Sequence, residues 1–263
     1  MMPKPRLAVY KFTSCDGCQL AFLNAGMDLL RLSELVEIVH FAEAGMLDPH
    51  ASLDITFVEG SISTPLEIKR LQRIREQTKY LVTMGACATN GGIQALRNAS
   101  NHAAWMASIY ATPQTIETLA TSTAIADHVQ VDWELWGCPV NAEQVFSTIR
   151  SLLFGATPSM TRDSVCLECK RQGHICVVVT KKEPCMGPVT KTGCGALCPG
   201  IGRACYACYG PSEHPNTQAL GALFQQQGVT DAMIARQFLH INNQAPAFQD
   251  AGTFFKGIKI VKA

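Results

Sequence analysis

The stretch RLAVYKFTSCDGCQL, residues 6–20, decides the fold of this chain. Its first half, from Arg6 to Phe12, is a short apolar run that predicts a buried strand. A C-x2-C pair, Cys15 and Cys18, follows at once, and apolar residues at helical spacing predict a helix over 18–32. In an open parallel sheet, ligands bind beyond the carboxyl ends of the strands. The stretch therefore predicts an α/β domain with a thiol site beyond its first strand.

The rest of the first half repeats this alternation of strands and helices. Thr64 and Pro65 form a typical helix start, a capping residue followed by proline at the first helical position. Residues 97–130 carry only weak signals and are expected to form short helices. The alternation is typical of a parallel sheet covered on both faces, here over residues 1–158. The further strands are expected at 36–41, 54–58, 80–84 and 131–136, and the further helices at 65–78 and 142–153.

Composition narrows the class of protein. The chain has 263 residues, of which 47% are hydrophobic and 16% charged, with a formal net charge of +1. Few charges and ample apolar surface predict a permanent protein partner. Basic residues occur only in short pairs such as Lys181 and Lys182, so a nucleic-acid partner is not expected.

No apolar run reaches the roughly 18 residues of a membrane span, and the N-terminus lacks a signal-peptide core. We therefore expect the cytoplasm, where thiols bind metals rather than form disulfides.

The second half, residues 159–263, is expected to be a cysteine-rich module followed by a tail. From Cys166 to Gly210 glycine and proline are frequent and no periodicity is convincing. So short a segment cannot build its own hydrophobic core and needs cross-links to stabilise it. Its cysteines can supply them, as metal ligands or as disulfides. The tail is expected to contain a helix over 231–240 and a strand-like end over 257–261, packed against the module or a partner.

Four of the twelve cysteines lie in the first half, at the predicted strand ends. Cys15 and Cys18 follow the first strand, Cys87 follows the strand at 80–84, and Cys138 follows the last strand. Three loops therefore deliver four thiols to one edge of the sheet. The predicted helix at Cys18 is expected to point its positive end at an anionic cluster there. Gly85, Gly91 and Gly92 are expected to let the backbone approach Cys87 closely.

The other eight cysteines crowd into 43 residues. Clusters are one interpretation, since four thiolates hold one cubane iron–sulfur cluster and twelve cysteines divide into three sets of four. Zinc is the competing interpretation, because C-x2-C pairs also occur in zinc ribbons. Irregular spacing, and the prolines directly after Cys138 and Cys198, favour clusters. The eight are Cys166, Cys169, Cys176, Cys185, Cys194, Cys198, Cys205 and Cys208.

Two other residues are candidates for function. Glu59, in the segment VEGSI at the end of the strand at 54–58, faces the same edge as the cysteines. A structural role is the default for it, and proton transfer is the alternative. His174 lies inside the cysteine-rich module but is not needed as a ligand, because the thiols already number twelve. Neither a Walker motif nor G-x-G-x-x-G occurs.

Four motifs together resemble one known family. They are TSCDGCQ at 13–19, VEGSI at 58–62, GACATNGG at 85–92 and GCP at 137–139. In this combination they resemble the small, electron-transfer subunit of nickel–iron hydrogenases. The run from Pro184 to Pro199 is similar to the cytoplasmic, multi-subunit branch, which includes sulfhydrogenase delta and NADP-linked types. The resemblance implies a flavodoxin-like parallel sheet domain followed by an irregular cysteine-rich iron–sulfur module.

The resemblance also implies cofactors, ligands and partners. Three [4Fe–4S] clusters are expected, with Cys15, Cys18, Cys87 and Cys138 as the proximal ligands. Electrons would come from the nickel–iron site of a large subunit and leave to a flavin or diaphorase subunit, with ferredoxin-like electron-transfer subunits as further partners. The expected distal ligands are Cys166, Cys169, Cys176 and Cys185, and the expected medial ligands are Cys194, Cys198, Cys205 and Cys208.

Two alternatives remain open from the sequence. One is the related iron–sulfur subunit of respiratory complex I, which resembles the chain over the proximal fold but usually has adjacent cysteines and one cluster. The other is a zinc-stapled interaction module without redox chemistry. The sequence leaves the terminal acceptor, the direction of flow and the cluster potentials undetermined.

Overall fold

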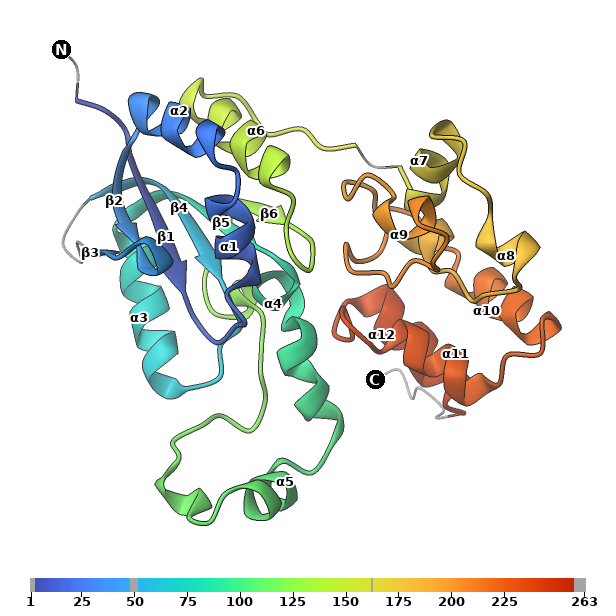
Figure 1. Cartoon of the computed structure of the whole chain (residues 1–263). Helices are drawn as coiled ribbons and strands as arrows, with labels where there is room; N and C mark the ends of the chain where they lie inside the picture. The colour runs from blue at the N-terminus through green and yellow to red at the C-terminus, as the bar shows by residue number, and fades with distance from the viewer. Residues whose placement is uncertain (1–2, 48–51, 162, 258–263) are drawn as a thin grey trace. The chain divides into compact units, whose positions relative to one another are not determined.

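The computed structural model describes residues 3–47, 52–161 and 163–257. The chain forms two compact units, residues 1–159 and residues 160–263. Each unit is described by itself below (Figure 1).

Unit 1 is built on one six-stranded sheet with the order β3-β2-β1-β4-β5-β6. All neighbouring strands are parallel except the pair of β2 with the two-residue β3. Without β3, the parallel strands follow one another in the flavodoxin-like order 2-1-3-4-5. The predicted flavodoxin-like sheet is therefore confirmed. The strands are β1 Arg6–Lys11, β2 Glu37–Phe41, β3 Met46–Leu47, β4 Leu53–Glu59, β5 Thr78–Met84 and β6 Trp133–Leu135.

Helices cover both faces of this sheet (Figure 1). On one face, Leu71 and Ile74 of α3 pack in a core that includes Ala8 and Tyr10 of β1. On the other face, Phe22 of α1 packs against Phe41, Phe57 and Phe146. Because both faces are buried, the strands are nearly continuous apolar runs. The helices of unit 1 are α1 Gly17–Leu23, α2 Met27–Leu35, α3 Pro65–Glu76, α4 Ala86–Asn90, α5 His102–Ile109 and α6 Ala142–Leu153, with short 3₁₀ helices at Ala42–Ala44, Gly92–Ala99, Pro113–Thr115 and Ile125–Asp127.

Local sequence explains where these helices begin and end. Thr64 caps α3 in a reciprocal capping box with Glu67, and Pro65 takes the first helical position, as predicted. The single helix predicted over 18–32 is wrong, because the chain turns between α1 and α2. Gly26 there has φ 58° and ψ −115°, a backbone conformation that L side chains rarely adopt. Helical spacing alone does not reveal such a break.

Unit 2 begins with the cysteine-rich segment, which contains only short helices. After it, three helices pack on one another around Phe224, Phe238 and Phe248, which are fully buried. The sequence analysis predicted only the middle one of these three. The helices of unit 2 are α7 Val165–Arg171, α8 Val177–Thr180, α9 Leu197–Gly200, α10 Thr217–Gln226, α11 Asp231–Phe238 and α12 Pro246–Phe255, with a 3₁₀ helix at Gly187–Val189.

The tail packs on the cysteine-rich segment, as expected. The Asn242 side-chain amide donates to the carbonyl of Ala207 at 2.6 Å, and the Gln227 amide donates to the carbonyl of Val178 at 3.3 Å. The expected strand at 257–261 falls mostly outside the described residues.

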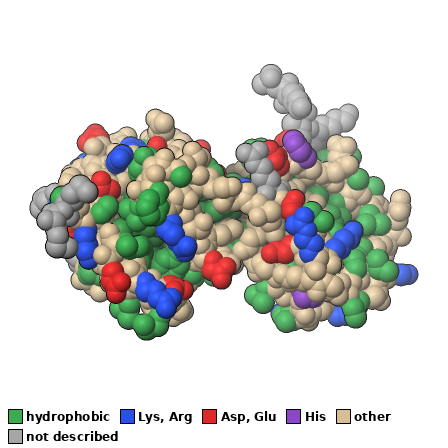
Figure 2. Space-filling model, turned by 90° about the horizontal axis from the view of Figure 1, so that it is seen from above, with side chains coloured by type: hydrophobic (Ala, Val, Ile, Leu, Met, Phe, Trp, Pro, Cys, Tyr) green, Lys and Arg blue, Asp and Glu red, His purple; other side chains and the backbone are tan. Residues whose placement is uncertain are grey.

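The surface of unit 1 exposes apolar side chains over α2 and α6. Figure 2 shows hydrophobic side chains gathered on this face between acidic and basic ones. A groove of about 560 Å³ runs between the two helices, lined by Leu32, Leu35, Phe146 and Ile149 among others. Among the helices of the described residues, none has the length and apolar character that a membrane crossing requires.

Candidate iron–sulfur site

Hydrogen bonds join the four loops that leave the carboxyl end of the sheet into two pairs. The loops after β5 and β6 are linked by the amides of Gly85 and Ala86, which donate to the carbonyls of Leu135 and Gly137, both at 2.7 Å. The loops after β1 and β4 exchange two bonds between Thr13 and Ser61, of 3.2 and 2.9 Å. The strands behind these loops are neighbours, β1-β4-β5-β6. The edge that includes the β1/β4 switch point is therefore a connected surface, where such folds bind ligands.

The four thiols of unit 1 meet at this edge. Burial raises the pKa of Cys18, and the charges of Glu59, Cys138 and Cys87 raise it further. Burial also raises the pKa of Cys87 from 9.0 to about 11, with contributions from Cys138 and Cys15. The pKa of Cys138 is raised by burial and then by Cys15. Cys87 and Cys138 thus lie within electrostatic range of each other and of both Cys15 and Cys18, and a bound cation would favour the thiolate forms of Cys18, Cys87 and Cys138.

Glycines keep the space beside these sulfurs open. A Cβ on Gly85 would lie 2.3 Å from the Sγ of Cys18, and one on Gly92 would lie 2.9 Å from the Sγ of Cys87. A Cβ on Gly17 would lie 3.3 Å from the Sγ of Cys15. The sequence analysis expected Gly85, Gly91 and Gly92 to make room at Cys87, whereas Gly85 makes room for Cys18 and a Cβ on Gly91 would meet Ala95. Three of the four sulfurs therefore lie where a side chain on the facing residue would displace or crowd them, so these glycines let the thiols sit at this edge.

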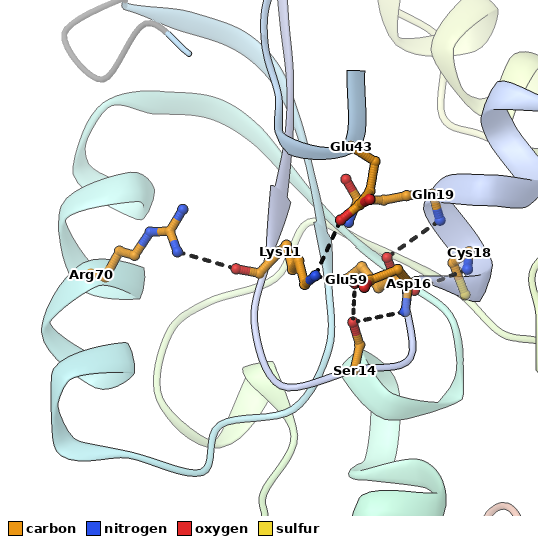
Figure 3. Close-up of polar contacts among 8 residues, drawn as sticks. All are labelled: Lys11, Ser14, Asp16, Cys18, Gln19, Glu43, Glu59 and Arg70. Carbon is orange, nitrogen blue, oxygen red and sulfur yellow. Dashed lines mark hydrogen bonds and ion pairs between the residues drawn. The ribbon is translucent and has the colours of Figure 1, made fainter. Parts of the chain in front are cut away.

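Glu59 lies at the end of β4 and caps α1 (Figure 3). Its carboxylate accepts hydrogen bonds from the amides of Cys18 at 2.9 Å and Gln19 at 3.3 Å. Glu59 is 2% exposed, and burial raises its pKa although these two bonds act in the opposite direction. The start of α1 was predicted to point its positive end at a cluster. Two of its first amides are engaged by Glu59, and the effect of the helix on a cluster stays a prediction.

A polar network that the sequence analysis missed holds the loop of Cys15 (Figure 3). The Nζ of Lys11 lies 2.6 Å from Oδ2 of Asp16 and 3.1 Å from Oε1 of Glu43. Hydrogen bonds to these carboxylates raise the pKa of Lys11. The hydroxyl of Ser14 also donates to Asp16 at 3.0 Å, and Asp16 has φ 63°. The network fixes the residue between the two cysteines in a strained conformation. The only sequence signal was an aspartate inside C-x2-C.

Four cysteines of unit 2 are close in space as well as in sequence. Burial raises the pKa of Cys169, with contributions from the charges of Cys166, Cys185 and Cys176. Burial likewise raises the pKa of Cys185, and Cys166 and Cys176 raise it further. Cys185 is buried, Cys166 and Cys169 are half-buried, and Cys176 is exposed. The structure thus brings together the set that the resemblance implies for the distal cluster.

The remaining four cysteines are only partly brought together. Burial raises the pKa of Cys205, followed by the charges of Cys185 and Cys208. Burial raises the pKa of Cys194 too, but the acidic group that contributes there is Glu168. Cys198 lies in α9 and is half-buried. The grouping of Cys194 and Cys198 with Cys205 and Cys208 therefore stays a prediction.

Two hydrogen bonds link the two sets in unit 2. The amide of Cys205 donates to the Sγ of Cys185 at 3.2 Å, and the amide of Met186 donates to the carbonyl of Cys205 at 3.1 Å. Within the described residues, which include all twelve cysteines, no three Cys, His, Asp or Glu side chains are grouped to hold a single metal ion. A zinc site needs its ligands at about 2.3 Å from one ion, whereas a cubane spreads its thiolates over four irons.

A flavodoxin-like unit with thiols at its switch point, followed by a cysteine-rich unit, defines the class of hydrogenase small-subunit-like proteins. Residues 15–152 match the family described as NADH ubiquinone oxidoreductase, 20 Kd subunit. The chain is 34% identical to sulfhydrogenase 2 subunit delta of Pyrococcus furiosus, over 88% of this chain and 97% of that protein. The chain belongs to the family described as NADH ubiquinone oxidoreductase, 20 Kd subunit. Its predicted resemblance to hydrogenase small subunits is confirmed.

Other relatives and solved structures agree with this assignment. The chain is 27% identical to a subunit of the F420-non-reducing hydrogenase of Methanococcus voltae, over 81% of this chain and 84% of the relative. A crystal structure of an NAD+-reducing [NiFe]-hydrogenase matches 60% of this chain and 96% of its own chain, with 26% identity and a TM-score of 0.55. An actinobacterial-type NiFe-hydrogenase from Ralstonia eutropha matches 97% of this chain and 90% of its own, with 17% identity and a TM-score of 0.59, which shows the fold.

Proposed function

We propose that the chain is the electron-transfer subunit of a nickel–iron hydrogenase complex, placed between the nickel–iron site of a large subunit and a flavin or diaphorase subunit. The observation that carries the proposal is the meeting of Cys15, Cys18, Cys87 and Cys138 at the switch-point edge, beside glycines that leave room for their sulfurs. The names of the relatives, which are hydrogenase subunits, support it. Ferredoxin-like subunits are further partners in this proposal, and the cytoplasm is the location.

Three [4Fe–4S] clusters are the proposed cofactors. A bound cluster supplies one-electron transfer at a potential set by charge, hydrogen bonds and solvent exposure. The chain contributes the thiolates, the burial of Cys18 and Cys205, and amides that donate to sulfur, such as Ala207 to Cys205 at 3.4 Å. The proximal ligands are Cys15, Cys18, Cys87 and Cys138, the distal ligands are Cys166, Cys169, Cys176 and Cys185, and the medial ligands are Cys194, Cys198, Cys205 and Cys208.

Glu59 is proposed to act mainly as a positioning residue. Its carboxylate holds the amides of Cys18 and Gln19, so it sets where a ligand-bearing helix begins. Proton transfer is the second role for which its burial and raised pKa qualify it. The two roles make different demands, because capping needs an acceptor and proton transfer needs a titratable group.

A complex I-type subunit is the second candidate function. The description of the matching family names an NADH ubiquinone oxidoreductase subunit, and the match covers the proximal fold alone. The eight further cysteines favour the hydrogenase proposal, since they have no counterpart in a one-cluster subunit.

The test is anaerobic purification of the tagged chain with its natural partners. We expect a nickel-containing subunit in the complex and hydrogen-dependent reduction of an artificial dye. Cys87→Ala should lower the iron content of the complex and slow this reduction. A complex that lacks nickel, or that oxidises NADH without responding to hydrogen, would contradict the proposal.

A further inference from the structure

The three helices α10, α11 and α12 have no role in the proposed function, yet a buried side chain beside them reaches the cysteine-rich segment. Asn242 lies between α11 and α12 and is 1% exposed. Its side-chain amide donates to the carbonyl of Ala207 at 2.6 Å. Ala207 lies inside the C-x2-C pair of Cys205 and Cys208. Because a buried amide is costly unless it is paired, this hydrogen bond ties the helices to the loop between two proposed cluster ligands.

Ala207 has a backbone conformation that needs such support. Its φ is 59°, in the left-handed region that L side chains rarely adopt. Its carbonyl also accepts from the amide of Gly210, at 3.1 Å. The C-x2-C pair of unit 1 is similar, since Asp16 has φ 63° and forms an ion pair with Lys11. In both pairs, a side chain from a separate element holds a strained residue between two cysteines.

The position of Ala207 affects both neighbouring cysteines. Its amide donates to the Sγ of Cys205 at 3.4 Å. Its carbonyl belongs to a planar peptide group that also contains the amide and the Cα of Cys208. A side chain that fixes this carbonyl therefore fixes the peptide plane that carries Cys208. Since hydrogen bonds to the sulfurs help to set the potential of a cluster, the contacts of Ala207 influence the potential of a cluster bound here.

The packed helices give Asn242 a fixed position. The carbonyl of Asn242 accepts from the amide of Ala245, the capping residue of α12, at 3.1 Å. On either side of this turn, Phe238 of α11 and Phe248 of α12 are fully buried, and their ring centroids lie 5.8 Å apart. None of these contacts needs a metal. The helices therefore hold the donor in place independently of the cluster.

We propose that Asn242 is a positioning residue for the cluster held by Cys205 and Cys208, and that it helps to set the potential of this cluster. The inference rests on the proposed function, because it takes these two cysteines as ligands. Loss of the Asn242 donor should let the strained loop relax and weaken the hydrogen bond from Ala207 to the sulfur of Cys205. Amide donors to sulfur stabilise the reduced, more negatively charged cluster. The potential should therefore become more negative.

Redox titration of the anaerobically purified complex, followed by electron paramagnetic resonance, tests this role. The signal of the cluster is identified as the one that Cys208→Ser alters. Asn242→Ala should lower the potential of that signal by at least a tenfold change in the reduction equilibrium, which is about 59 mV for one electron.

Asn243→Ala is the matched control. Asn243 is 4% exposed, and its side-chain amide donates to the carbonyl of His240, in its own loop, at 2.9 Å. Its loss should lower the stability of the protein about as much as Asn242→Ala does, because each variant removes a buried hydrogen bond. The potential should stay unchanged in Asn243→Ala. A role confined to folding would affect the two variants alike, so equal potentials in both would overturn the inference.

A second variant keeps the test decisive where Asn242→Ala loses the cluster. Ala207→Gly removes the strain in the loop, because glycine adopts positive φ readily. The double variant Ala207→Gly/Asn242→Ala should therefore keep its iron, and its potential should shift less than that of Asn242→Ala. Failure of Ala207→Gly to restore lost iron, or an equal shift with and without it, would contradict the positioning role.

The outcomes separate this inference from the proposed function. Hydrogen-dependent dye reduction by the unchanged complex tests the proposed function. If that activity is absent while Asn242→Ala still shifts the potential of the cluster, the hydrogenase proposal fails and the positioning role stands. If the activity is present and the potential of Asn242→Ala is unshifted, the positioning role alone is wrong.

Discussion

The sheet edge of unit 1 and the cysteine-rich segment of unit 2 hold thiols in different ways. At the sheet edge, four buried parallel strands end side by side, and a core on each face fixes where Cys15, Cys18, Cys87 and Cys138 lie. In residues 163–210, short helices and turns carry the cysteines, and the apolar core of the unit lies mainly in α10, α11 and α12. Thiols on a packed scaffold are positioned before a metal arrives, whereas thiols on turns need the metal to stabilise their positions.

Removal of the clusters should produce the largest difference between the two regions. Without metal, residues 163–210 should lose most of their protection, because metal binding substitutes for a core there. Unit 1 should stay partly protected, and so should α10–α12, whose phenylalanines pack without any metal. Hydrogen exchange of loaded and metal-free protein measures this segment by segment. Equal protection of the sheet and of residues 163–210 in the metal-free protein would contradict the comparison.

Gly85→Ala tests how tightly unit 1 fits its cluster. The new Cβ would meet the Sγ of Cys18 at 2.3 Å, and the backbone has φ 90°. We expect a loss of about four irons and about 2–4 kcal/mol of unfolding free energy. Gly45→Ala is the matched control, since its φ is 75° and nothing lies within 4 Å of its Cβ. It should cost about 1–2 kcal/mol and keep all iron. Iron analysis and denaturant unfolding distinguish the two variants. Equal iron loss in both would contradict the claim that Gly85 is needed to make room for Cys18.

Variants of Glu59 test whether capping or proton transfer is its main role. Glu59→Ala leaves the amides of Cys18 and Gln19 without their acceptor and should cost about 1–3 kcal/mol. Glu59→Gln keeps an acceptor for one of the two amides without a titratable group, so it should cost less and retain iron. Under the capping role, dye reduction by the complex with Glu59→Gln should stay close to that of the unchanged complex. A fall of about 10² or more with full iron content would instead assign proton transfer.

Substitution of Cys198 should change the fold least of all these variants and should alter one cluster specifically. Four thiolates favour a complete cubane, and Cys198 supplies the fourth of the medial set. Cys198→Pro, as well as the milder Cys198→Ala, should yield a three-iron cluster and leave hydrogen splitting on the partner intact. Electron paramagnetic resonance of the oxidised variants should show a three-iron signal that is absent from the unchanged protein. The same signal in the unchanged protein, at full stoichiometry, would show that Cys198 is not a ligand.

The sequence predicted the sheet and the four thiols of unit 1 well, because buried parallel strands and strand-end cysteines leave strong local signals. It missed the break at Gly26, since helical spacing continues on both sides of the turn. It also missed the Lys11–Asp16–Glu43 network, whose members lie in separate elements and match no motif. The helices α10 and α12 escaped prediction because each contains a glycine, which weakens the local helical signal, while tertiary packing stabilises them.

The iron and acid-labile sulfide content of the anaerobically purified complex, divided by the amount of this chain, tests the central claim most directly. Other iron-bearing subunits are first removed, or their iron is subtracted by analysing each separately. The account predicts about twelve irons and about twelve sulfides for this chain, as three [4Fe–4S] clusters require. About four irons, with the eight cysteines of unit 2 binding zinc or nothing, would contradict it.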